Sequence, residues 1–319
     1  MIAEDFSIYL TKEGVSMSSL KKLKVSPKHY HEYVNGKKED EENKNLIIGT
    51  AIHHYILEPD VFKNRYVCLT NDMLPVANKN GVKNYQSKEN REYRDSFKEK
   101  HKDKIVIDES DYEFVKSLGE SACSIDKIKK LFKVGISEVS CYKTDPKTGL
   151  ILKGRVDRIN TKASLIIDIK TCADASPIGF QRAIKQNSYY NQAKWYLDLF
   201  DQQTFLFCAI EKSDSKNCEL YSLDEKFLNQ AMRENRMLLD ILFWCKKNNE
   251  WPDYGDFQAL KAQYKKYSLY DAGADETIQR LDEYVKEERS MFYELSWDNY
   301  YDIEGNSSVI RPVMLLKEN

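Results

Sequence analysis

The segment that decides the fold runs from Leu150 to Cys172 and reads LILKGRVDRINTKASLIIDIKTC. Its first ten residues follow a proline-containing turn and predict the second strand of a β-hairpin. Residues 165–169 are apolar apart from Asp168, which is typical of a central strand buried on both faces. Asp168 and Lys170 therefore place two charges on the most apolar strand of the sheet. Buried charges are costly unless they are paired or take part in chemistry.

Helical and strand patterns alternate on both sides of this segment. Helices are expected, from apolar residues at helical spacing, over residues 46–57, 109–132, 177–200, 223–248 and 275–295. Further strands are expected over residues 138–142, 205–210 and 218–222. This order predicts a mixed α/β fold in which a small central mixed β-sheet is flanked by helices.

The balance of charges excludes one broad class of protein. The chain has 319 residues, of which 49 are Lys or Arg and 51 are Asp or Glu, for a formal net charge of −2. A strongly basic coat for wholesale nucleic-acid binding is therefore excluded, whereas a local basic groove is not. The hydrophobic fraction of 41% is enough for a real core and argues against disorder throughout.

The sequence shows no sign of export or of membrane insertion. Its start, MIAEDFSIYLTKEG, lacks the basic stretch and apolar run of a signal peptide. Its longest apolar stretches are far too short to span a bilayer. The seven cysteines are scattered and form no CxxC motif, so neither a disulfide framework nor a thiolate zinc site is expected. We therefore expect a cytoplasmic protein with no membrane partner.

Asp157 and Asp168 are the candidate centre of a metal site. They lie on successive predicted strands, and pairing of those strands would bring the two carboxylates together. A divalent cation would relieve their repulsion, and oxygen ligands favour Mg²⁺ or Mn²⁺. Lys170 shares a strand face with Asp168 and would add a positive charge for an attacking water or a developing phosphate charge. The alternative for the D-x-K triplet alone is a buried Asp–Lys ion pair, with Asp157 capping a turn.

Three further features favour the metal site. Small residues one turn before His53 allow another backbone to approach that helix face, which would place His53 within reach of the sheet edge as a ligand. Glu138 lies one strand before Asp157, and antiparallel pairing could add it to the same acidic cluster. Gln192 and Tyr196 share one helix face and could hydrogen-bond to phosphates or sugars. Taken singly, each would more often be an ordinary core, surface or amphipathic-helix residue.

The order of these motifs resembles a known nuclease superfamily. The motifs are G-T-A-x-H at residues 49–53, E-x-S at 138–140, G-R-x-D at 154–157, D-I-K-T at 168–171 and Q-x-x-x-Y at 192–196. Together they resemble the RecB-like branch of the PD-(D/E)XK nucleases. The similarity is closer still to the RecE-type exodeoxyribonuclease domain of phages and prophages (exonuclease VIII). It spans roughly residues 16–251 and includes Ser18-Ser19-Leu20-Lys21. The sequence departs from the superfamily motif at Val156, where Pro is often found, and at Asp168, where Glu is commoner; neither change removes a carboxylate.

The resemblance implies a metal-dependent exonuclease that degrades linear double-stranded DNA from 5′ to 3′. From the oxygen ligands we expect Mg²⁺ as the cofactor, with Mn²⁺ as an alternative, and two ions at full occupancy of the active site. The resemblance also implies that the product carries a 3′ single-stranded tail for a RecT-like annealing protein in phage recombination. Relatives of this type suggest a ring of identical subunits around the DNA.

The resemblance also assigns roles to individual residues. The implied metal ligands are His53, Asp157, Asp168 and the carbonyl group of Ile169, with Glu138 in the metal shell. Lys170 would be the catalytic lysine, acting together with Asp157 and Asp168. The residues implied to lie beside the DNA are Gln192 and Tyr196. The candidates for binding the 5′ phosphate of the DNA are Arg155, Ser18 and Ser19.

The span of the resemblance also sets the predicted domains and the alternatives. We predict a nuclease domain over residues 1–256 and a helical C-terminal extension of unknown role over residues 257–319. One alternative is a RecB-like nuclease with another polarity or substrate, such as single-stranded or flap DNA. A second is a catalytically idle module that binds DNA ends. The last is a cytosolic α/β protein in which the Asp–Lys pair is only structural.

Overall fold

The computed structural model describes residues 1–36, 44–287, 291–293 and 312–314. At its centre lies a six-stranded sheet in the order β1-β4-β5-β6-β7-β8. These strands are β1 (Ile2–Ala3), β4 (Ile136–Thr144), β5 (Ile151–Asn160), β6 (Leu165–Cys172), β7 (Thr204–Glu211) and β8 (Cys218–Tyr221). Strands β6 and β7 are parallel, and the other neighbouring pairs of this sheet are antiparallel. The mixed α/β fold expected from the sequence is confirmed.

The deciding segment forms the middle of this sheet. Strand β5 follows a tight turn that ends at Gly149, whose φ of +73° is a conformation that glycine adopts without strain. Strand β6 lies between β5 and β7, and its first five residues are buried. Helices α9 (Pro177–Gln186) and α10 (Tyr189–Phe200) make the long crossover that the parallel strands β6 and β7 require.

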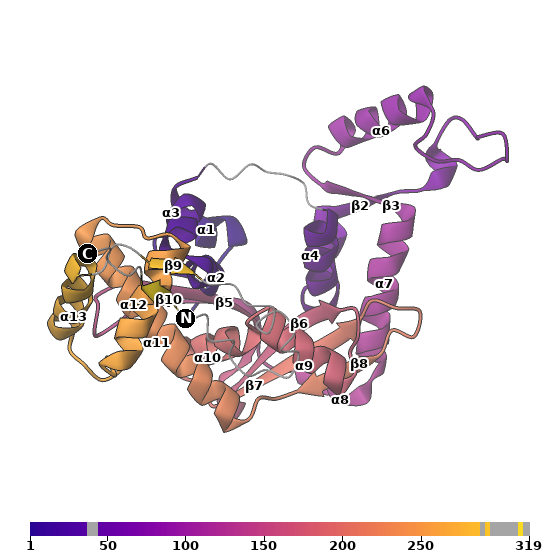
Figure 1. Ribbon diagram of the computed structural model, residues 1–319. Helices are drawn as coiled ribbons and strands as arrows, with labels where there is room; N and C mark the ends of the chain where they lie inside the picture. The colour runs from indigo at the N-terminus through magenta and orange to yellow at the C-terminus, as the bar shows by residue number, and fades with distance from the viewer. Residues whose placement is uncertain (37–43, 288–290, 294–311, 315–319) are drawn as a thin grey trace.

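Helices cover both faces of the sheet (Figure 1). The first face packs against α2 (Met17–Val25), α9, α10 and α11 (Glu225–Asn248). The second face packs against α4 (Lys44–Leu57), α7 (Glu109–Ser124) and α8 (Asp126–Lys133). Along β6, Ile166 belongs to the first core, whereas Ile167 and Ile169 belong to the second. Strand alternation therefore directs Asp168 and Lys170 to the first face.

A smaller unit stands apart from the central sheet. Strands β2 (Tyr66–Leu69) and β3 (Ile105–Asp108) form a parallel pair that the sequence patterns did not predict. Between them the chain forms η1 (Asn71–Met73) and α6 (Lys88–Lys100). Figure 1 shows this unit projecting beyond the ends of α4 and α7. The remaining helices on the N-terminal side are α1 (Phe6–Thr11), α3 (Pro27–Asn35) and α5 (Pro59–Arg65).

Three predicted helices differ from the observed ones. The pattern over residues 177–200 forms two helices, α9 and α10, which are separated by Asn187 and Ser188. The pattern over residues 109–132 forms two helices, α7 and α8, because the backbone of Ile125 between them is extended. The pattern over residues 275–295 forms α13 (Ala274–Glu287), but β9 (Met291–Tyr293) then pairs with β10 (Pro312–Met314). Apolar spacing alone detects neither the local break nor the distant strand partner. Residues 288–290, 294 and 295 of this predicted helix lie outside the described residues.

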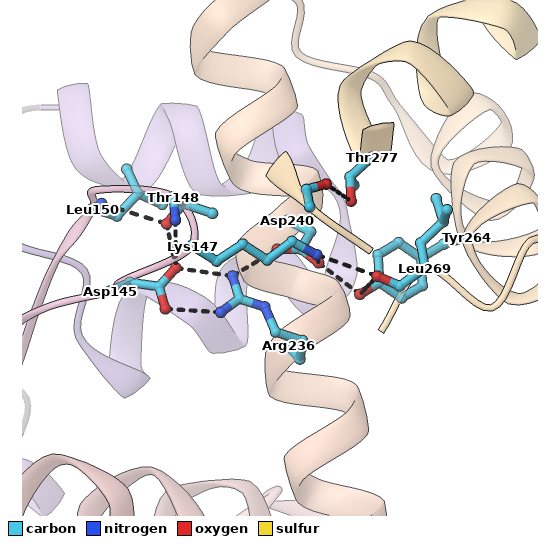
Figure 2. Close-up of polar contacts among 10 residues, drawn as sticks. Asp145, Lys147, Thr148, Leu150, Arg236, Asp240, Tyr264, Leu269 and Thr277 are labelled. Atoms are coloured by element: carbon cyan, nitrogen blue, oxygen red, sulfur yellow. Dashed lines mark hydrogen bonds and ion pairs between the residues drawn. The ribbon is translucent and has the colours of Figure 1, made fainter. Parts of the chain in front are cut away.

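Polar contacts fix the turn between β4 and β5 to α11 and to α12 (Tyr254–Lys266), as Figure 2 shows. Arg236 donates hydrogen bonds to both carboxylate oxygens of Asp145 at 2.8 and 3.0 Å. Lys147 and Tyr264 both donate to Oδ2 of Asp240, at 2.7 and 2.6 Å. We call the four charged residues of this group, Asp145, Lys147, Arg236 and Asp240, the turn cluster.

The C-terminal helices pack on the main core. Helix α12 begins before residue 256 and continues to Lys266, and its Leu260 and Tyr264 are buried in the first core together with Leu281 of α13. The division of the chain at residue 256 stays a prediction. Beyond Glu287, the predicted extension lies outside the described residues apart from β9 and β10. None of the helices in the described part of the chain is both long and apolar enough to cross a membrane.

Candidate active site

Strands β5 and β6 separate where the two aspartates lie. The ladder between them pairs Arg158 with Ile167 and continues for two more pairs towards the loop. The next position in this register would set Asp157 opposite Asp168, but the ladder ends there. Oδ2 of Asp157 instead accepts a hydrogen bond of 2.7 Å from the backbone N–H of Ile169. A side chain thus replaces a backbone acceptor, and the two strands open at this point.

Three potential metal ligands meet beside this opening. Single ligand atoms of His53, Glu138 and Asp157 all lie within 4.8 Å of one another. His53 comes from α4, and Asp157 comes from β5. Glu138 occupies the β4 position opposite Asp157 in the strand register, and its φ of +55° interrupts the ladder there. The structure thus places the glutamate, the histidine and the first aspartate of the sequence motifs in one group, which we call the ligand cluster.

The donor set of this cluster fits a divalent cation. One imidazole nitrogen and two carboxylate oxygens suit a hard or borderline divalent ion better than a monovalent one. Nδ1 of His53 lies 3.4 Å from Oδ2 of Asp157, so the imidazole and the carboxylate already face each other. All three side chains line one cavity of about 1120 Å³, which gives a solvent-borne ion and a substrate a route to them.

The electrostatics of the cluster reflect two half-buried carboxyl groups close to each other. Burial, reinforced by the charge of Asp157, raises the pKa of Glu138 to about 7. Burial also opposes ionisation of Asp157, but His53 outweighs it and holds the pKa of Asp157 below its usual value. The same pairing raises the pKa of His53 against the effect of burial. A shifted glutamate in a cavity is typical of a functional site.

Asp168 and Lys170 form a close ion pair next to this cluster. Asp168 is 1% exposed, and its Oδ2 lies 2.5 Å from Nζ of Lys170. Burial raises the pKa of Asp168 to about 6, although the ammonium group of Lys170 opposes that rise. Asp168 lies outside the group of three ligand atoms within 4.8 Å. Its role as a metal ligand, like that of the Ile169 carbonyl, stays a prediction.

Arg155 is tied to the cluster by its side chain. Its Nε donates to Oε2 of Glu138 at 2.7 Å, and its Nη1 donates to the backbone carbonyl of Glu4 at 2.7 Å. The guanidinium group therefore orients Glu138 and links it to the N-terminal segment. No sequence pattern predicted the hydrogen bond between Arg155 and the carbonyl group of Glu4. Contact between Arg155 and a 5′ phosphate stays a prediction.

Gln192 and Tyr196 lie on α10 where that helix crosses β5. Nε2 of Gln192 donates to the hydroxyl group of Tyr196 at 3.4 Å, so the two share a face as the spacing requires. The ring of Tyr196 packs against Gly154, where an added Cβ would lie 2.9 Å from a ring carbon. Only 9% of Tyr196 is exposed, but it lines the cavity. The glycine of the G-R-x-D motif thus allows α10 to approach the strand that carries Asp157.

The cavity also reaches the serines at the start of α2. Ser18 and Ser19 line it together with His53, Arg155 and Asp157. Ser19 is buried, and its hydroxyl group is engaged in a capping box with Ser16. Ser18 is exposed. Binding of a 5′ phosphate by these serines stays a prediction.

Two of the solved structures to which this chain is similar are named as exonucleases. A "putative exonuclease" from Eubacterium rectale has a TM-score of 0.54 and 15% identity, covering 78% of this chain and 86% of that one. A phage-related exonuclease from Haemophilus somnus 129PT has a TM-score of 0.33 and 14% identity, covering 76% of this chain and 99% of that one. The first of these likenesses shows a shared fold. No curated protein matches this chain.

A protein-family model provides the remaining comparison. It is described as "PDDEXK-like domain of unknown function (DUF3799)" and matches residues 16–263. The match therefore includes the ligand cluster, the Asp168–Lys170 pair and the Gln192–Tyr196 face. Because it covers well over half of the sequence, the chain belongs to this PDDEXK-like family.

Proposed function

We propose that the protein is a metal-dependent exodeoxyribonuclease that degrades linear double-stranded DNA from 5′ to 3′. One observation carries the proposal: the ligand cluster of His53, Glu138 and Asp157 opens into a cavity next to the Asp168–Lys170 pair. Membership of the PDDEXK-like family and the fold shared with a "putative exonuclease" support a nuclease. The 5′-to-3′ direction of degradation and the double-stranded DNA substrate rest on the resemblance of the sequence motifs to RecE-type enzymes.

The residues of the site would have separate roles in the reaction. His53, Glu138 and Asp157 would hold a divalent cation, Mg²⁺ or Mn²⁺, together with Asp168 and the Ile169 carbonyl when the site is filled. Such an ion supplies Lewis acidity and a bound water of lowered pKa. Lys170, oriented by Asp168, would place its ammonium group against the negative charge that develops on the scissile phosphate. Ile169 and Arg155 would keep Asp157 and Glu138 in position through their hydrogen bonds.

The proposal extends to product and partners. A 5′-to-3′ exonuclease leaves a 3′ single-stranded tail, which a RecT-like annealing protein could bind during phage recombination. Several copies of the chain would form a ring around the duplex. In that arrangement each subunit needs positive charge only where it faces DNA, which agrees with a net charge of −2.

A strand-resolved digestion tests the function. A blunt 5′-phosphorylated duplex, labelled at the 3′ end of one strand in one sample and at its 5′ end in another, is incubated with Mg²⁺ or with EDTA. We expect rapid release of the 5′ label, slow loss of the 3′ label, and no reaction in EDTA. Asp168→Asn should be inactive, whereas Asp198→Asn, an exposed residue paired with Lys194, should match the wild type.

Each other result contradicts a defined part of the proposal. Initial release of the 3′ label would overturn the polarity. A strong preference for single-stranded or flap DNA would overturn the substrate. Absence of any cleavage would overturn the nuclease and favour a module that only binds DNA ends.

A further inference from the structure

Helix α2 brings a second ammonium group towards the Asp168–Lys170 pair. Nζ of Lys21 lies 5.3 Å from the ring centroid of Tyr189, the first residue of α10. Nζ of Lys170 lies 5.0 Å from the centroid of the same ring. The two ammonium groups are therefore no farther apart than these two distances added together. Lys21 belongs to the Ser-Ser-Leu-Lys motif of the sequence, for which the proposed mechanism has no use.

Lys21 has no anionic partner of its own among the described residues. The nearby carboxylate, that of Asp168, is already in contact with Lys170 at 2.5 Å. Burial and the positive charge of Lys170 lower the pKa of Lys21 to about 8, although Asp168 opposes them. A cation over an aromatic ring gains only ~0.5–2 kcal/mol, so the ring compensates an unpaired, half-buried charge in part. The group of Lys21, Lys170 and Asp168 therefore has one positive charge more than its own carboxylate can neutralise.

Lys24, one turn further along α2, shows how this helix satisfies a structural lysine. Its Nζ lies 3.0 Å from Oε2 of Glu234 and donates to the hydroxyl group of Tyr190 at 2.9 Å. It also donates to Oδ1 of Asn191 at 3.0 Å. Helix α2 thus surrounds Lys24 with hydrogen-bond acceptors. It leaves Lys21 with the ring of Tyr189 and the nearby positive charge of Lys170. This contrast indicates that the partner of Lys21 comes from outside the chain.

We infer that Lys21 binds a backbone phosphate of the DNA strand that enters the active site, and that it is a further substrate-binding residue beside Lys170. The inference rests on the proposed function and names a contact that the function alone does not require. A compact ammonium group on a flexible stem suits a single phosphate oxygen. Ser18, on the same helix, lines the cavity that contains the metal ligands, so a strand in that cavity passes α2.

The rival explanation is that Lys21 only ties α2 to α10 through the ring of Tyr189. Affinity for DNA as a function of salt separates the two. Removing one ammonium group that binds a phosphate should reduce the slope of log K against log salt by ~0.9 for duplex DNA. A packing role would lower the thermal midpoint and leave that slope unchanged.

The test compares Lys21→Met and Lys21→Arg with Lys129→Met, an exposed lysine on α8 at the opposite face of the sheet. Binding of a 5′-phosphorylated duplex is measured with Ca²⁺ in place of Mg²⁺, from low to moderate salt, and cleavage is measured with Mg²⁺.

For Lys21→Met we expect a salt slope smaller by ~0.9. Its kcat/KM should fall about tenfold or more, because a charge-assisted hydrogen bond to the substrate is removed. Its thermal midpoint should be equal or higher. Lys21→Arg should keep the slope, and Lys129→Met should match the wild type.

The outcomes separate this inference from the proposed function. If the wild type cleaves DNA and Lys21→Met keeps the slope and kcat/KM of Lys129→Met, the inference is wrong and the function stands. If the wild type neither binds nor cleaves DNA, the function itself fails. Should Lys21→Met not fold, Lys21→Gln replaces it, and an unchanged slope in that variant assigns Lys21 a packing role.

Discussion

Two groups of charged residues in this protein are buried or half-buried and are built differently. In the turn cluster, two acids meet two bases: Arg236 binds Asp145 with two nitrogens, and Lys147 lies 2.7 Å from Asp240. Burial raises the pKa of Asp145, but Arg236 outweighs it and keeps that pKa below its usual value. In the ligand cluster, Glu138 instead has a pKa raised to about 7.

The difference shows what each group is for. A buried charge with a matched partner holds elements together, as the turn cluster holds the β4–β5 turn to α11 and α12. A glutamate whose pKa is raised by burial and by a neighbouring carboxylate, beside a cavity, lacks a cation that the chain does not supply. A divalent ion would provide it. We therefore expect changes in the ligand cluster to affect activity, and changes in the turn cluster to affect stability.

Among variants that keep every carboxylate of the site, Lys170→Ala should give the largest effect. Without the ammonium group, the negative charge that develops in the reaction is less stabilised, and kcat should fall by ~10²–10³-fold. Binding of duplex DNA with Ca²⁺ should persist, because other contacts to the DNA remain. Single-turnover cleavage measures the first quantity and a binding titration the second. Lys194→Ala, on α10 and paired with the exposed Asp198, serves as the control; an equal fall of kcat in both variants would contradict the assignment.

Arg236→Ala should give the largest loss of stability. It leaves Asp145 without its bidentate partner and removes one of the two cations from Asp240, and breaking such a buried pair costs about 3–5 kcal/mol. Denaturant unfolding measures this loss against Arg233→Ala, an exposed arginine on the same helix. The kcat of the folded fraction should stay near that of the wild type. A stable but inactive variant would mean that the turn cluster belongs to the catalytic machinery.

Gly154→Ala tests strand β5, which follows the turn cluster and carries Asp157 of the ligand cluster. A Cβ at this position would lie 2.8 Å from Leu199 and 2.9 Å from the ring of Tyr196. Overpacking of this kind costs about 1–3 kcal/mol. Because α10 would have to move from β5, we also expect weaker cleavage. Gly273→Ala is the matched control, since a Cβ there meets no atom within 4 Å; unfolding free energies that fall equally in both variants would refute the close-approach argument.

The smallest effect is a dependence of stability on pH. Glu138 binds its proton more tightly in the folded chain than its ordinary pKa of 4.5 allows, so the folded state holds more protons between pH 4.5 and about 7. Its contribution therefore destabilises the metal-free fold progressively as the pH rises through that range. Glu138→Gln should flatten this part of the profile, and Mg²⁺ should stabilise the wild type most at the upper end. A wild-type profile that Glu138→Gln leaves unaltered would contradict the raised pKa.

Local patterns in the sequence were sufficient for the centre of the fold. The apolar run of β6 and the turn before β5 predict two adjacent strands, and their alternation puts Asp168 and Lys170 on one face. The antiparallel register then sets Glu138 opposite Asp157. These features depend on residues close together in the chain, where spacing carries the information.

Contacts between distant segments could not be predicted in this way. The parallel pairing of β2 with β3 spans a long insertion, and periodicity does not say which strands meet. The approach of Lys21 to the ring of Tyr189 depends on how α2 and α10 pack. The hydrogen bond from Arg155 to the Glu4 carbonyl likewise depends on where β1 pairs with β4. Each of these is decided by tertiary packing.

Cleavage of linear duplex DNA by the wild type, followed as a function of Mg²⁺ concentration, tests the central claim most directly. The account predicts no cleavage in EDTA and a rate that rises with Mg²⁺ to saturation, with Asp157→Asn inactive at every concentration. Cleavage that is equally fast in EDTA, or an Asp157→Asn variant with the wild-type Mg²⁺ dependence, would contradict it.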